Sequence, residues 1–119
     1  MSFDIVTMVE PDFLRITATG KYLAEELFDF IELVRSTADD AGRNRVFVDC
    51  RQIDGDMSEA ERFEGGKRIA EVFGSRLKAA VVLPAGQVTK LGELTAVNRG
   101  AKLLVTESES EAVNWLVKP

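Results

Sequence analysis

Three unbroken runs of apolar residues, separated by segments with helical periodicity, constrain the fold of this chain more than any other feature. The runs lie at residues 46–48, 79–83 and 103–105. Such runs are typical of parallel strands that helices cover on both faces. The segments with helical spacing lie at about residues 58–73, 88–98 and 109–117. Strand and helix therefore alternate, and right-handed crossovers onto a parallel sheet are the expected connections.

The N-terminal third adds an antiparallel hairpin and one more helix. Residues 3–9 and 13–19 are rich in β-branched and aromatic side chains, and the turn-forming triplet Glu10-Pro11-Asp12 separates them. From Leu23 to about Gly42, apolar residues recur every three to four positions, which predicts an amphipathic helix. We therefore expect an α/β fold in which the hairpin and this helix precede three strand–helix units.

Length and local signals favour one folded domain over residues 1–119. An apolar fraction of 45% and a charged fraction of 29% are those of a globular protein. Ser58 with Glu61, and Ser108 with Glu111, have the spacing of a capping box, which marks helix starts. Gly74 and Gly100 suit helix ends, because a left-handed residue is often needed there.

Composition also excludes several classes of function. The net charge of −5 opposes nucleic acid and anionic lipid, and the absence of histidine removes the commonest general base and metal ligand. A single cysteine, Cys50, can form neither an internal disulfide nor a structural zinc site. The start lacks the pattern of a secretion signal, and no apolar run is long enough to span a bilayer. We expect a cytoplasmic protein without metal or cofactor.

Several stretches resemble the SpoIIAA-like proteins, a bacterial group with the STAS fold of anti-sigma-factor antagonists, also described as relatives of the CRAL-TRIO lipid carriers. They are Val46–Gly55, Glu61-Arg62-Phe63, Asn98-Arg99-Gly100 and Glu111–Leu116. In the antagonists, the loop after the third strand carries Asp-Ser-Ser-Gly, and a partner kinase phosphorylates a serine there. Here the stretch is Asp56-Met57-Ser58-Glu59, so the resemblance implies Ser58 as phosphoacceptor, although the glycine is missing.

The carboxyl ends of the parallel strands are the expected position of a partner or ligand site. The candidate residues of this rim are Arg51, Asp54, Asp56, Ser58, Glu59, Gln87 and Thr89. Acidic residues cluster after the strands and basic residues before them. Either the acidic rim faces a cation or basic partner, or each charge complements a helix dipole, which we favour. Carboxylates at 54, 56, 59 and 61 also suggest a hard-cation site, but turn and cap chemistry explains them.

Two interior glycines, Gly65 and Gly66, are the least expected local feature of the second predicted helix. Each costs that helix about 1 kcal/mol relative to alanine. The pair indicates either close packing of this helix or space for an apolar ligand, in which case Phe63, Gly65, Gly66 and Ile69 would line the pocket. Cys50 is expected to be a small buried hydrophobe, and Trp115 to dock the last helix on the sheet.

The leading functional hypothesis is a non-enzymatic, STAS-like module that recognises another protein through this rim and the second helix. The alternative is a carrier or sensor of a small apolar, lipid-like ligand in a pocket near that helix. An enzyme that uses carboxylates is the third hypothesis. The hairpin edge and the last helix would also allow a homodimer.

Overall fold

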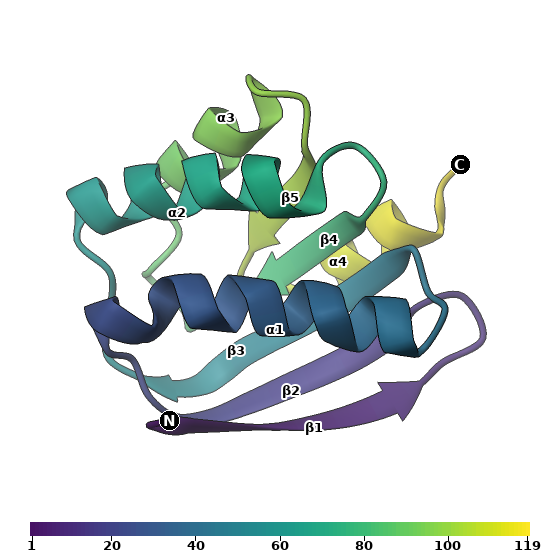
Figure 1. Cartoon of the computed structure of the whole chain (residues 1–119), viewed down its shortest axis with the longest axis horizontal. Coiled ribbons are helices and arrows are strands. Elements are labelled where there is room, and N and C mark those ends of the chain that lie inside the picture. The colour runs from purple at the N-terminus through teal and green to yellow at the C-terminus, as the bar shows by residue number, and fades with distance from the viewer.

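A five-stranded sheet forms the centre of the structure, a computed structural model that describes all 119 residues. Its strands are β1 (Phe3–Val9), β2 (Leu14–Lys21), β3 (Arg45–Asp54), β4 (Lys78–Val82) and β5 (Lys102–Thr106). They lie in the order in which they occur in the chain (Figure 1). β1 is antiparallel to β2, and every later pair is parallel. The predicted hairpin and parallel sheet are therefore confirmed.

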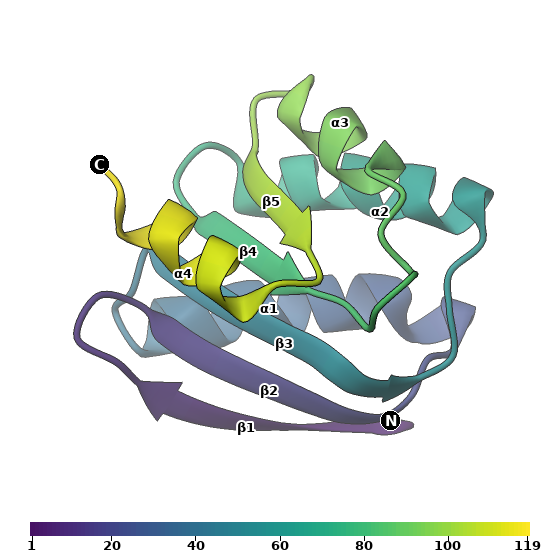
Figure 2. The same ribbon diagram turned by 180° about the vertical axis from the view of Figure 1, so that it is seen from behind.

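Helices cover the two faces of the sheet unequally. A 3-10 turn, η1 (Ala24–Glu26), leads into α1 (Leu27–Asp40), which lies with α2 (Glu59–Phe73) and α3 (Leu91–Val97) on one face. Only α4 (Glu109–Val117) lies on the other face, against β3, β4 and β5 (Figure 2). On that face the hairpin strands have no helix over them. Each helix of the chain is too short or too polar to cross a membrane.

Two apolar cores follow from this arrangement. The larger core, on the face covered by α1, α2 and α3, includes Val46, Val48 and Cys50 from β3. The smaller core packs Phe47 of β3 and Phe13 against Ala112 and Leu116 of α4. Because neighbouring residues of a strand point to opposite faces, the unbroken apolar run of β3 supplies both cores.

The third strand is longer than its apolar run. β3 continues to Asp54 because its polar second half pairs with β2, through Thr19 with Gln52 and Gly20 with Ile53. The register shifts between Thr17 and Thr19, where β3 carries an extra residue. Cys50 and Arg51, which the sequence placed in the loop after this strand, are therefore part of the strand.

The start of α2 matches its predicted signal, and the starts of α3 and α4 differ from theirs. Ser58 and Glu61 form a complete capping box at the start of α2. Ser108 accepts a hydrogen bond from the Glu111 N–H, but its own N–H donates to Thr106 Oγ1, so that box is one-sided. α3 begins at Leu91, later than predicted, because Lys90 takes a left-handed conformation with φ of 68°.

The two edges of the sheet differ in exposure. At β5, the Val105 N–H donates to Glu93 Oε1 at 2.6 Å and the Val105 carbonyl accepts from Lys90 Nζ. Side chains thus occupy the backbone groups that another strand would need. At β1 the outer edge has no strand beside it, and Val6 and Met8 are exposed on the uncovered face of the hairpin.

Candidate functional site

A network of side chains joins the loops at the carboxyl edge of the sheet. Arg62, on the first turns of α2, is almost fully buried and lies with its guanidinium 2.5 Å from Asp56 and 3.3 Å from Glu59. Glu59 in turn accepts a hydrogen bond from Thr89 Oγ1 at 3.0 Å. The structure therefore brings together three of the predicted rim residues, Asp56, Glu59 and Thr89, around an arginine that holds them in place.

The beginning of α2 carries a second hydrogen-bonded group. The Ser58 hydroxyl accepts from the Glu61 N–H at 3.1 Å, and Glu61 accepts from the Ser58 N–H and from the Tyr22 hydroxyl, both at 3.0 Å. These bonds, led by that from the Ser58 backbone, lower the pKa of Glu61, whereas burial raises the pKa of Tyr22. Ser58 is exposed and caps the helix, and its phosphorylation stays a prediction.

The predicted charge sorting corresponds to helix capping. Asp56, Glu59 and Glu61 engage in ion pairs, caps and hydrogen bonds near the start of α2. At the opposite edge, Lys78 Nζ donates to the carbonyl groups of Trp115 and Lys118 at the end of α4.

No group of three or more carboxylate or thiol side chains is arranged to hold a metal ion. Asp54, at the end of β3, is the acidic rim residue that is exposed and forms no ion pair.

An apolar cavity lies between the sheet and the helices α1, α2 and α3, with a volume of about 160 Å³. Gly65, Gly66 and Ile69 line it, as does the rim residue Gln87. Phe63 does not, because it lies about 100° around the helix from Arg62. Its ring is exposed, with Lys67 and Arg99 over it at 5.0 and 5.6 Å.

The glycine pair allows α2 to pack closely on two helices at once. A Cβ on Gly66 would lie 2.5 Å from the carbonyl oxygen of Gly92 and 2.8 Å from Thr95 Cβ, both on α3. A Cβ on Gly65 would lie 3.3 Å from Leu27 Cδ2 of α1. Close packing on α3 therefore requires Gly66, whereas Gly65 meets only the end of a flexible side chain, and the cavity lies beneath both.

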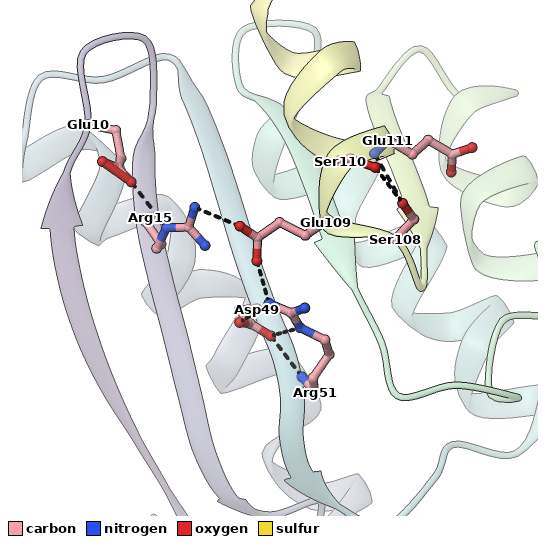
Figure 3. Close-up of polar contacts among 8 residues, drawn as sticks. All are labelled: Glu10, Arg15, Asp49, Arg51, Ser108, Glu109, Ser110 and Glu111. Atoms are coloured by element: carbon pink, nitrogen blue, oxygen red, sulfur yellow. Dashed lines mark hydrogen bonds and ion pairs between the residues drawn. The ribbon is translucent and has the colours of Figure 1, made fainter.

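Arg51 belongs to the opposite face of the sheet. It binds Asp49 through two side-chain hydrogen bonds, of 3.0 and 2.8 Å, and Glu109 of α4 at 2.7 Å (Figure 3). Glu109 also pairs with Arg15 at 3.4 Å, and Arg15 pairs with Glu10 at 3.2 Å. This chain of ion pairs joins the hairpin, β3 and the start of α4, so Arg51 has a structural role there and lies away from the rim.

We expect the Asp49–Arg51 pair to make stability depend on acid pH. Hydrogen bonds from the Arg51 side chain lower the pKa of Asp49, while its burial acts in the opposite direction. A carboxyl group whose pKa is lowered in the folded state stabilises the fold at pH values above its unfolded-state pKa of about 4. This stabilisation is lost as the pH falls through the folded-state pKa. Asp49→Asn should therefore reduce the free energy of unfolding by about 1–3 kcal/mol at pH 7, and by less at pH 3.

Urea unfolding monitored by circular dichroism at both pH values measures this difference. Asp54→Asn is the matched control, because Asp54 lies on the same strand but is exposed. Equal effects of Asp49→Asn at pH 7 and pH 3 would contradict the assigned role of the ion pair.

Sequence reasoning missed the residues that complete the carboxyl edge. Tyr22 and Arg62 were not among the candidates, and neither were Lys90 and Glu93. One signal was present for Arg62, because it shares the helical spacing of Gly66, Ile69 and Phe73 and therefore had to face inward. No sequence pattern indicates that Lys90 takes a positive φ.

Comparisons with known proteins support the fold. No family model matches the chain, and no curated protein matches it. An anti-sigma factor antagonist from Mycobacterium paratuberculosis shares 12% identity at a TM-score of 0.64, over 98% of this chain and 96% of that one. A protein of the DUF3478 family from Shewanella loihica, described as having a SpoIIAA-like fold, shares 18% identity at a TM-score of 0.56, over 97% and 94%. An RsbS variant from Moorella thermoacetica shares 13% at 0.51, over 94% and 93%.

The chain therefore has the SpoIIAA-like, or STAS, fold that the sequence resemblance predicted. At sequence identities this low, the similarity establishes a shared fold and nothing about a shared function. Its structural neighbours include an anti-sigma factor antagonist, and the function of this chain has to be argued from its own surface.

Proposed function

We propose that the chain is a non-enzymatic, STAS-type module that recognises another protein through the outer surface of α2 and α3. The observation that carries this proposal is a set of apolar side chains exposed there: Phe63 on α2, and Leu94 and Val97 on α3. Their exposed fractions are 38%, 55% and 45%. Large apolar side chains exposed on neighbouring helices are common where proteins bind one another.

The charge beside this surface suggests the chemistry of the partner. Glu59 and Asp56 lie at the start of α2, and Asp54 ends the preceding strand, so the apolar side chains adjoin an acidic edge. Because Arg62 and Thr89 hold Asp56 and Glu59, little side-chain entropy is lost when a partner binds them. We propose a partner segment with an apolar anchor flanked by basic residues.

Two further observations support binding over catalysis. The rim carboxylates at 56, 59 and 61 are engaged in ion pairs and caps, which leaves them poorly suited to proton transfer. Moreover, a structural neighbour is named as an antagonist of an anti-sigma factor, and such a name describes action on another protein.

A double variant on the proposed surface, Phe63→Ser with Leu94→Ser, tests this function. The matched control is Val6→Ser with Met8→Ser, which removes apolar side chains that are at least as exposed but lie on β1. Each immobilised protein is incubated with extract of the source organism, and the bound proteins are quantified by mass spectrometry. We expect a partner retained by the wild type and the control, and reduced at least about tenfold with the α2–α3 variant.

Charge provides the second part of the test. Asp54→Lys should weaken the purified complex, and its effect should shrink as salt rises, because exposed charges are screened. A partner that the α2–α3 variant retains at wild-type level would contradict the proposed surface.

A further inference from the structure

The cavity beneath α2 has the size of a small-molecule site. Its volume is about 160 Å³, and an apolar protein cavity of about 150 Å³ is large enough to hold benzene. It lies between the sheet and three helices, so that elements from most of the chain contribute to it. Close-packed interiors seldom leave a space this large.

The interior of this cavity is apolar. Of the 29 residues that line it, 17 are hydrophobic. Most of them come from β3, β4, β5, α1 and α2, and they include Val48, Cys50, Val81, Val105, Leu27 and Ile69. Water needs two to four polar partners to be held in a cavity, and these walls offer few. An apolar occupant would therefore be favoured over water.

The residues at the carboxyl edge decide the charge of the occupant. Six charged residues belong to the lining, and they balance: Lys21, Arg62 and Lys90 against Glu26, Asp56 and Glu93. The buried guanidinium of Arg62 is already paired with Asp56, and Lys90 with Glu93. The one lining cation outside these pairs, Lys21, is exposed to solvent, so an ionised ligand buried here would lose its hydration without gaining a buried counter-charge, which is costly.

One polar group at this edge is available to a neutral ligand. Gln87 lines the cavity and is half-buried, and its side-chain amide makes no hydrogen bond within the protein. The amide can both donate and accept a hydrogen bond. It could therefore orient a ligand that carries one hydroxyl or carbonyl group.

We propose that this cavity binds one uncharged apolar molecule of about six to ten non-hydrogen atoms, such as a single-ring aromatic or a short branched alcohol. The site is distinct from the α2–α3 surface, which lies on the outside of the same helices. The volume is too small for a long acyl chain, and the balanced charges disfavour a carboxylate.

Titration of the purified chain with defined probes tests the proposal. Benzyl alcohol is neutral and has eight non-hydrogen atoms, benzoate is similar in size but charged, and palmitate is long. By two-dimensional NMR we expect benzyl alcohol to bind saturably at about 1 mM or tighter, and benzoate to bind at least about tenfold more weakly. Palmitate should not displace benzyl alcohol. The amide shifts should centre on Cys50, Gly65 and Val81.

A filled cavity supplies the control. Val81→Phe places a ring in the space and should weaken benzyl alcohol binding at least about tenfold, whereas Val97→Phe makes the same change on the exposed face of α3 and should leave it unchanged. If Val81→Phe does not fold, the shift map of the wild type decides the question. Absence of saturable binding, shifts confined to the outer helices, or binding of benzoate as tight as that of benzyl alcohol would overturn the proposal. None of these outcomes depends on a protein partner.

Discussion

Replacing Gly66 with alanine should lower the free energy of unfolding by about 1–2 kcal/mol. The added Cβ would lie 2.5 Å from the Gly92 carbonyl oxygen, a backbone atom that cannot move without shifting α3. Overpacking of this kind costs about 1–3 kcal/mol and occasionally more, and the better helix propensity of alanine returns about 1 kcal/mol. The net effect is a loss, because the contact is shorter than real Cβ contacts reach.

The neighbouring glycine is the matched control. A Cβ on Gly65 would meet Leu27 Cδ2 at 3.3 Å, and this atom is the far end of a flexible side chain that can rotate away. Gly65→Ala should therefore be neutral or should stabilise the chain by up to about 1 kcal/mol. Both variants add one methyl group to α2, at adjacent positions. The difference between their free energies of unfolding therefore measures how closely α2 packs on α3.

Urea unfolding at equilibrium is the appropriate measurement, with an unchanged slope as the check that the two-state comparison is valid. Equal stabilities for Gly65→Ala and Gly66→Ala would mean that the two helices do not approach as closely as described. A large loss for Gly65→Ala alone would place the tight contact on α1 instead of α3.

The glycine pair also shows where sequence reasoning stops. Two glycines inside a helix indicate either close packing of that helix or room beside it for a ligand. Their positions along the helix do not distinguish these two cases. The answer depends on which helices lie on each side of α2, and residues 65 and 66 point to different neighbours. In the structure close packing explains Gly66, and a cavity nevertheless lies below both glycines.

Most of the fold was predictable because its signals are local. The apolar runs of β3, β4 and β5, the turn after β1 and the cap at Ser58 each depend on a few adjacent residues. The second half of β3 was not predictable in this way. Arg51 and Asp54 were predicted to lie on the rim beyond the strand, and the strand continues through them because Gln52 to Asp54 pair with Thr19 to Lys21 of β2.

The structure brings together some of the residues predicted for the rim and separates others. Asp56, Glu59 and Thr89 lie together as expected, whereas Arg51 lies on the opposite face because β3 continues through it and its neighbour Cys50 points into the larger core. Its contact with Glu109 joins residues far apart in the chain, and no local pattern indicates that contact. For Phe63, an apolar residue within a helix was assigned to the interior, although its neighbour Arg62 occupies the inward position.

The single thiol offers a sensitive test of the cavity wall. Cys50 lines the cavity, and its burial raises the pKa of the thiol to about 12. Only the thiolate reacts with alkylating agents, so a rise of about three units lowers the reactive fraction near pH 8 about 1000-fold. We expect native Cys50 to react with iodoacetamide at least about 1000-fold more slowly than the same residue in urea.

The pH dependence of the labelling rate distinguishes a raised thiol pKa from steric exclusion of the reagent. Between pH 7 and pH 10 the rate for a buried thiol with a raised pKa should keep rising about tenfold per unit, whereas the rate for an exposed thiol levels off near its ordinary pKa. Val97→Cys in a Cys50→Ala background supplies the exposed thiol, because residue 97 lies on the outer face of α3. Labelling rates from mass spectrometry give both profiles. Equal rates for the two thiols would show that Cys50 is open to solvent, and the cavity would then have no closed wall at β3.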